Sequence, residues 1–264
     1  MMASHTPPSS TYEEAPLISN RFIVRATIAV AVLAAVTIGV NLAGRWIGQR
    51  LELAGHTTST ETVAVAIGED ALRLPENTIR FANQRRNGPA ERLDLYLAWP
   101  RMQGYSEDDR SLFSDISQSS GLIFLQVTES VMSRDMSGRL EPIYSHLIEG
   151  PAGNAGHGLT LHRLRADAGY GGEVLLTAAR PGMEQYVVRC ILPSAPDKAT
   201  SGDCQRDIGV GKDLSVLYRF SSAHLADWDH IDAAIMTFVT DHLVVRAAAS
   251  NAETTGDTAS NAAK

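Results

Sequence analysis

The chain has 264 residues, of which 44% are hydrophobic and 20% are charged, so it has room for one substantial core with accessory segments. Its formal net charge of -7 argues against a nucleic-acid partner, because neutralising phosphates requires a basic face or stripe. The first residues are rich in Pro, Ser and Thr, and residues 1–21 are therefore expected to form a disordered cytoplasmic tail.

A long apolar run follows this tail. Between Arg25 and Arg45 lie 19 uncharged residues, mostly Ala, Val, Leu and Ile. A helix needs about 20 apolar residues to cross about 30 Å of hydrocarbon, so residues 22–43 are predicted to form one transmembrane helix in the lipid bilayer. A cleaved signal peptide and a buried core helix are the alternatives. The first is disfavoured by the long start and the poor cleavage site "VNLAG", and the second by the lack of a polar stripe.

The remaining chain is predicted to form one α+β domain at 62–245, after a linker at 44–61 and before a disordered tail at 246–264. Alternating or continuous apolar residues predict strands at 62–67, 91–99, 121–129, 158–166, 172–180, 184–192 and 214–220. A short helix is expected at 141–150, and an amphipathic helix at 222–245 with Ser221 or Ser222 as its cap. Consecutive strands with segregated helices favour an antiparallel sheet covered by the last helix.

The densest basic stretch is "RFANQRRNGPAER", which precedes the clearest amphipathic strand. Its arginines form a candidate contact patch for an acidic partner or for anionic headgroups: Arg80, Arg85, Arg86 and Arg92. The simpler interpretation is a solvated turn whose charges are balanced by Glu76 and Glu91. The mixed-charge segment "MSRDMSGRLEPIY" is either an ion-paired loop or a second contact patch.

Candidate catalytic and metal-binding residues are weak. The glycine-rich segment at 150–162 has no helix after it, so it is interpreted as a flexible surface loop rather than a phosphate cradle. No G-x-S-x-G elbow is present. His224, Asp227 and His230 cluster in sequence near the start of the last helix, but solvated helix surface is the simpler interpretation. No cofactor and no metal ion are predicted.

The chain contains two cysteines, Cys190 and Cys204, which flank the loop-like segment "ILPSAPDKATSGD" between two strands. An even count at loop-closing spacing beside a membrane anchor favours a disulfide, with two reduced cysteines as the alternative. Flanking arginines do not orient the anchor, because two lie on each side. A disulfide persists outside the reducing cytosol, so the large domain is expected to lie in the periplasm.

The segments "LPENTIRFANQRRNGPAERLDLYLAWP", "MSRDMSGRLEPIY" and "RDIGVG…LSVLYRF…LADWDHID" resemble a group of uncharacterised single-pass envelope proteins of Gram-negative bacteria. The resemblance covers Leu74 to Asp232 and implies an inner-membrane anchor followed by a periplasmic domain, without implying an activity. The closing pattern "RC…C…YRF…L..W..ID" is also similar to periplasmic immunity proteins of contact-dependent secretion systems.

The sequence therefore favours a non-catalytic binding or scaffold component of the cell envelope, with an envelope protein as its partner. An immunity-like toxin-binding protein is one alternative. An envelope hydrolase that uses His224, Asp227 or His230 is the other.

Overall fold

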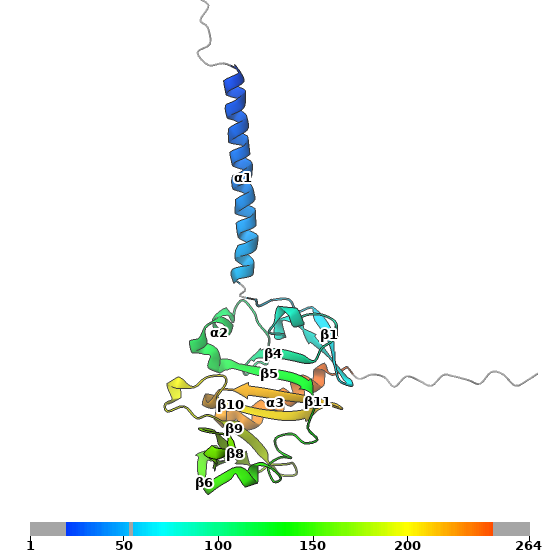
Figure 1. The fold of residues 1–264 in the computed structure, drawn as a ribbon, viewed down its shortest axis with the longest axis vertical. Helices are drawn as coiled ribbons and strands as arrows, with labels where there is room; N and C mark the ends of the chain where they lie inside the picture. Colours follow the sequence, from blue (N-terminus) through cyan, green and yellow to red (C-terminus); the bar gives the residue numbers. More distant parts are fainter. Residues whose placement is uncertain (1–19, 53–54, 245–264) are drawn as a thin grey trace, which may run out of the picture. The chain divides into compact units, whose positions relative to one another are not determined.

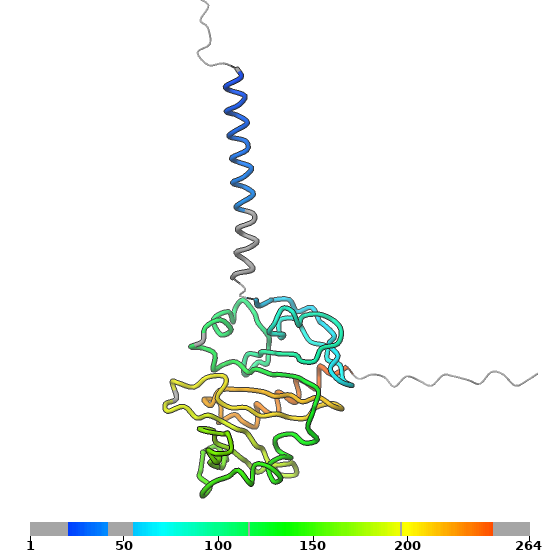
Figure 2. Tube along the Cα trace, in the orientation of Figure 1, coloured from blue at the N-terminus to red at the C-terminus, as the bar shows by residue number. Residues whose placement is uncertain are grey.

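The computed structural model describes residues 20–52 and 55–244, and the chain divides into an apolar helix and a globular unit that begins at Gly55 (Figures 1 and 2). The predicted tails at 1–21 and 246–264 lie almost entirely outside the described residues. The globular unit is α+β, as predicted.

Helix α1 spans Asn20–Glu52, about ten residues longer than the predicted membrane segment. Good helix formers such as Leu51 and Glu52 continue the backbone pattern beyond the apolar run, so part of the predicted linker at 44–61 is helical. The stretch from Arg21 to Asn41 is long and apolar enough to cross a membrane, and none of it is buried within the described structure. Two hydroxyls inside the run bond to the preceding turn: Thr27 Oγ1 donates to the Ile23 carbonyl at 3.0 Å, and Thr37 Oγ1 donates to the Leu33 carbonyl at 2.9 Å.

The globular unit contains an eight-stranded antiparallel sheet in the order β4-β5-β11-β10-β9-β8-β7-β6. Its strands are β4 (Arg92–Ala98), β5 (Leu122–Glu129), β6 (Ile148–Gly156), β7 (Leu159–Leu164), β8 (Val174–Ala178), β9 (Tyr186–Cys190), β10 (Cys204–Val210) and β11 (Leu214–Phe220). A smaller sheet in the order β2-β1-β3 comprises β1 (Thr62–Ile67), β2 (Asp70–Pro75) and β3 (Gly88–Pro89). All seven predicted strands are present.

The helices of the globular unit are short except for the last. They are α2 (Arg110–Ser114) and α3 (Trp228–His242), with 3-10 turns η1 (Glu76–Thr78), η2 (Ala82–Gln84), η3 (Ile116–Gly121), η4 (Tyr144–Leu147), η5 (Ala166–Ala168), η6 (Pro196–Lys198) and η7 (Ser222–Asp227). The predicted cap is confirmed, because the Ser221 side chain accepts a hydrogen bond from the Ala223 amide at the start of η7.

Two predictions in the 141–162 region are wrong. The expected helix at 141–150 is only the single turn η4, and Gly150 and Pro151 lie inside β6 instead of ending a helix. The expected glycine-rich surface loop is β6 and the start of β7, joined by the tight turn His157-Gly158. Both turn residues have positive φ, 53° and 76°, which a two-residue hairpin turn of the primed type requires.

Strand β4 is buried more completely than its alternating pattern predicts. Leu93, Leu95 and Leu97 form the expected apolar face. On the other face, however, Tyr96 is only 2% exposed and Asp94 only 8%. Both faces of this part of the sheet are therefore at least partly covered.

One face of the large sheet carries the main core. Helix α3 and the small sheet pack there, and α3 crosses the sheet near β10 and β11 (Figure 1). Val244, the last residue that the structure describes, also joins this layer, because its amide donates to the Ala71 carbonyl at 2.8 Å. Core residues of α3 are Ile231, Ile235 and Val239, each at most 1% exposed. The predicted covering of the sheet by the last helix is confirmed.

The opposite face of the large sheet is covered at one end. There a second apolar cluster joins the 136–148 segment to β7, β8 and β9, with Met136 and Tyr144 resting on Leu175 and Val187. Over β4, β5 and β11 the same face is more open, and cavities described below lie along it.

Two tight turns lock the small sheet to the large one. The Asp70 carboxylate, in the β1–β2 turn, accepts hydrogen bonds from the amides of Lys212 and Asp213 in the β10–β11 turn. In return, the Asp213 carboxylate accepts from the Glu69 amide. A Cβ at Gly211, which has φ +69°, would collide with the Asp70 carboxylate, so glycine is required where the turns meet.

The predicted disulfide is present between Cys190 and Cys204, the last residue of β9 and the first of β10. The two residues are direct cross-strand partners with a Cα–Cα distance of 4.0 Å, and both are buried in the core. The loop that they close is tied to the last helix, because Asp203 accepts from the Ser222 hydroxyl at 2.6 Å. The disulfide thus links the adjoining ends of β9 and β10, in the middle of the sheet, and closes the loop that contacts the start of η7.

Candidate functional site

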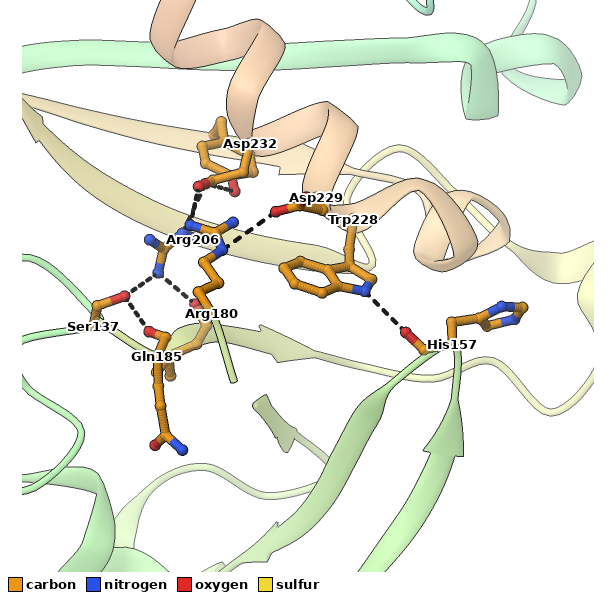
Figure 3. A network of polar contacts seen from close by, with 10 residues as sticks. Ser137, His157, Arg180, Gln185, Arg206, Trp228, Asp229 and Asp232 are labelled. Atoms are coloured by element: carbon orange, nitrogen blue, oxygen red, sulfur yellow. Dashed lines mark hydrogen bonds and ion pairs between the residues drawn. The ribbon is translucent and has the colours of Figure 1, made fainter. Parts of the chain in front are cut away.

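A buried ionic network joins α3 to the large sheet (Figure 3). The Asp232 carboxylate of α3 accepts hydrogen bonds from Arg206 Nε of β10 at 2.9 Å and from the Tyr218 hydroxyl of β11 at 2.5 Å. Arg180, from the loop after β8, reaches the other Asp232 oxygen at 2.7 Å. The Arg206 and Asp232 side chains are 4% and 7% exposed, so this carboxylate is neutralised almost out of contact with water.

Arg206 also closes a gap in the sheet. The ladder between β9 and β10 is only two residue pairs long, and beyond it Arg206 Nη1 donates to the Val187 carbonyl and to the Ser137 hydroxyl, each at 2.9 Å. Ser137 in turn donates to the Gln185 carbonyl at 2.6 Å (Figure 3). One guanidinium therefore holds β9, the 131–143 segment and α3 together.

Aromatic rings surround these charges. The guanidinium of Arg180 lies 4.9 Å from the Tyr186 ring centroid and 5.2 Å from that of Trp228. Trp228 Nε1 donates to the His157 carbonyl at 3.0 Å, which attaches the β6–β7 turn to α3 (Figure 3). Such rings lower the cost of burying a cation.

The titration of the network reflects its burial. Burial by itself would raise the pKa of the Asp232 carboxyl, but Arg206, the Tyr218 hydrogen bond and Arg180 outweigh it and hold that pKa below its usual value. Burial, together with the neighbouring Tyr186 and the Asp232 charge, raises the pKa of Tyr218 well above its usual value. Asp232 is therefore ionised and Tyr218 neutral at neutral pH, as a structural clamp needs.

The structure separates the residues suggested for a hydrolase. His224 and Asp227 lie half-buried in η7, whereas His230 is exposed in the first turn of α3. Within residues 20–52 and 55–244, no hydrogen bond links any two of the three, and no group of His, Cys, Asp and Glu side chains is arranged to hold a metal ion. The geometry does not assemble these three into a catalytic arrangement.

The four arginines of the candidate contact patch have different roles. Arg85 lies against the backbone, where its guanidinium donates to the carbonyls of Ile79 and Arg80 at 3.0 and 3.1 Å. Arg92 forms an ion pair with Asp94. Arg80 places its guanidinium 4.9 Å from the Phe124 ring centroid, and Arg86 is exposed. Arg80 and Arg92, but neither Arg85 nor Arg86, line a cavity on the open sheet face.

This cavity, of about 500 Å³, is the first lobe of a groove along β4, β5 and β11. Its floor is the outer face of the three strands, and its walls come from the α2–η3 segment and from residues 200–202 of the disulfide-closed loop. The lining residues that matter most below are Arg80, Arg92, Asp94, Phe113, Phe124 and Arg219.

The second lobe, of about 550 Å³, continues the groove toward the 130–139 segment. Gln126 of β5 and Leu217 of β11 line both lobes, which makes the two cavities neighbours on the same sheet face. Arg139 and Asp207 form an ion pair in this lobe, so "MSRDMSGRLEPIY" is at least partly an ion-paired segment. Next to it, Val131 is 95% exposed and Met132 is 55% exposed, which leaves an apolar rim in solvent.

The arginine that the sequence did not single out is Arg219. It alternates with the buried residues Tyr218 and Phe220, which points its side chain to the outer face of β11. This alternation is a usable signal for its exposure. Its position opposite Phe124, however, follows from strand register, which the sequence does not reveal.

Comparisons with known proteins relate the chain to others by fold only. No protein-family model and no curated protein sequence matches it. Among solved structures, an immunity protein of the Stenotrophomonas maltophilia type IV secretion system is similar with a TM-score of 0.50 and 18% identity, covering 72% of this chain and 96% of that one. The Neisseria meningitidis iron-regulated outer membrane lipoprotein FrpD gives a TM-score of 0.42 and 9% identity, covering 71% of this chain and 94% of that one.

Proposed function

We propose that this protein is a single-pass inner-membrane protein of the bacterial envelope whose globular unit lies in the periplasm and binds another protein. The observation that carries the binding role is the two-lobed groove on the open face of the large sheet. Concave sites that combine apolar surface with a few charged groups are where proteins usually bind their ligands. The groove is built mainly on strands and on a loop closed by a disulfide, so its shape is set before a partner arrives.

Two observations support the location. The 21-residue stretch from Arg21 to Asn41 meets the length and composition requirements for a membrane span. The disulfide between Cys190 and Cys204 is a buried part of the core, and such bonds persist mainly outside the reducing cytosol. Together they favour an anchor in the inner membrane with the globular unit on its periplasmic side.

A topology fusion tests this location. We expect alkaline phosphatase fused after Val245 to be active in intact bacteria, because that enzyme needs the oxidising periplasm to form its own disulfides. Green fluorescent protein at the same position serves as the matched control and is expected to be dark. A fluorescent fusion with inactive phosphatase would place the globular unit in the cytosol and contradict the proposal.

Site-specific photo-crosslinking tests the binding role. We expect benzoylphenylalanine at Ser201 or Gln126, both of which line the groove, to crosslink the full-length protein in membranes to one discrete partner. The exposed Glu149 of strand β6 provides a control position away from the groove. Equal crosslinking from Glu149, or none from the groove positions across growth conditions, would argue against a partner in the groove.

The fold likeness raises a second candidate function, that of an immunity protein that neutralises a toxin delivered by a secretion system. The crosslinking experiment separates the two candidates through the identity of the partner. A resident envelope protein supports the first, whereas a toxin whose lethality depends on loss of this protein supports the second.

A further inference from the structure

We infer that the first lobe of the groove recognises an acidic segment of a protein partner, whose carboxylates bind Arg80 and Arg219 while its apolar side chains rest on the ring of Phe124. This inference rests on the proposed binding function and assigns the chemistry of the partner. Three features of the lobe support it: both arginines line it, neither has a carboxylate partner among the described residues, and apolar side chains lie among its lining residues.

Both arginines lie in the same lobe as Phe124. Arg80 places its guanidinium 4.9 Å from the Phe124 ring centroid. Arg219 is the direct cross-strand partner of Phe124 between β11 and β5, so its Cβ lies on the same face about 5 Å from that of Phe124. Segments far apart in the sequence thus bring two cations into the cavity that contains Phe124.

Neither cation is neutralised within the part of the chain that the structure describes. Arg80 and Arg219 form no ion pair there, and both side chains lie on exposed residues. Asp94, an acidic residue in the same lobe, is already occupied, because it pairs with Arg92 and also accepts from Gln84 at 2.9 Å. The other, Asp115, accepts from the Ser117 amide and hydroxyl.

Arg80 and Arg219 line the same cavity, so an anion bound in it would be attracted by both guanidinium groups. The positive charge of these two arginines contrasts with the whole chain, which carries a formal net charge of -7. An acidic protein that keeps two unpaired arginines together in a preformed cavity has the features of a complementary patch for a negatively charged partner.

The apolar lining of the lobe favours a protein over a small anion. Leu112 and Phe113 of the wall and Phe124 and Leu217 of the floor line the lobe together with Thr200 and Ser201. A free phosphate would use the arginines and hydroxyls but would leave these apolar side chains in water. Arginine beside aromatic and aliphatic surface is the usual composition of energetically important protein–protein contacts. A cavity of about 500 Å³ also holds several side chains of an extended segment.

Binding of defined peptides to the full-length protein in detergent tests the inference. The probe is a fluorescent peptide of about ten residues, in which Glu and Leu alternate, and its anisotropy reports binding; ten extended residues span about 33 Å. Matched peptides carry Gln or Lys in place of Glu. We expect the Glu peptide to bind, and to bind at least about tenfold more tightly than the Gln peptide, because charge-assisted hydrogen bonds are lost in the latter.

The variants Arg219→Glu and Arg80→Glu are each expected to weaken binding of the Glu peptide by about tenfold or more. Arg73→Glu is the matched control, since Arg73 is also an exposed strand arginine but lies outside the groove, and it should change binding by less than about twofold. Arg219→Gln keeps a neutral side chain of similar length and provides a second test if the reversed charge disturbs folding.

Equal binding of the Glu and Gln peptides would overturn the inference, as would equal loss in Arg73→Glu and Arg219→Glu. So would binding of inorganic phosphate at the arginines without any binding of the Glu peptide. The proposed function fails separately: if groove positions still crosslink a partner while Arg80→Glu and Arg219→Glu leave that crosslink unchanged, the binding role stands and only the acidic character of the partner is rejected.

Discussion

Replacing Asp232 by alanine is expected to lower the free energy of unfolding by about 3–5 kcal/mol. The substitution leaves Arg206 and Arg180 charged, with their shared carboxylate gone, in a site where the Arg206 side chain is only 4% exposed. It also removes the acceptor of the Tyr218 hydroxyl. Urea unfolding of the full-length protein in detergent, followed by tryptophan fluorescence, measures the change through Trp228, which lies one helical turn before Asp232.

Asp229→Ala is the matched control. Asp229 lies on the same helix and contacts the same arginine, with 3.3 Å to Arg180 Nε, but its side chain is 63% exposed. We expect Asp229→Ala to lower the free energy of unfolding by less than about 1 kcal/mol, because exposed ion pairs contribute little to stability. A further variant, Arg206→Met with Asp232→Leu, removes both charges and should be less destabilised than the sum of its single substitutions. Equal effects of Asp232→Ala and Asp229→Ala would contradict the central role given to the buried pair.

The same carboxyl predicts the direction of acid sensitivity. Since its folded-state pKa is depressed, the stability that Asp232 contributes is fully present above its unfolded value of about 3.9. That contribution is lost as the pH falls through the lower folded-state pKa. Protonation of Asp232 therefore accounts for part of the stability that the wild-type protein loses below about pH 4. The stability of Asp232→Ala should fall less over the same pH range.

The second large effect is expected for the disulfide. Reduction, or the double substitution Cys190→Ala and Cys204→Ala, should lower the stability by about 3 kcal/mol, the chain-entropy value for a loop near 15 residues. For a globular unit of this size, that corresponds to a fall in Tm of about 6–12 °C. The effect should be larger if the loop releases Asp203, because the Ser222 hydroxyl at the entry to η7 then loses its acceptor.

The double alanine variant shows whether the reductant affects stability other than by breaking this disulfide. Dithiothreitol should lower the Tm of the wild-type protein and leave that of the variant unchanged, with both measured in the same detergent. Rapid alkylation of both sulfurs in native, unreduced protein would show that the bond is absent, and the periplasmic location would lose one of its two supports.

Most strands were predictable because their side chains alternate. The pattern of "LSVLYRF" matches β11, and "TVAVAI" matches β1. Strand β10 was missed because its sequence, "CQRDIGV", places Arg206 at an inward position. A buried arginine is unfavourable in a strand unless it is neutralised, and here Asp232 of α3 neutralises Arg206. The contact with Asp232 therefore outweighs the local sequence preference of β10. Arg206 and Asp232 are too far apart in the sequence for a local pattern to include both.

The candidate site was predictable only in part. The sequence singled out Arg80 and Arg92, which line the groove, together with Arg85 and Arg86, which do not line it. Arg219 was passed over because a single charge within a strand is unremarkable. The pairing of β11 with β5 places Arg219 opposite Phe124 in the lobe that Arg80 also lines, and strand order cannot be inferred from alternation alone.

The reciprocal contact between Asp70 and Asp213 has a consequence for how the globular unit opens. Each carboxylate holds the backbone of the other turn, so neither hairpin can fray at this end without releasing its counterpart. Sub-global opening of the small sheet alone would break bonds that belong to the large one. In terms of native-state exchange, the two sheets are then expected to share one cooperative unit, in which the small sheet is as protected as the strands that carry the groove.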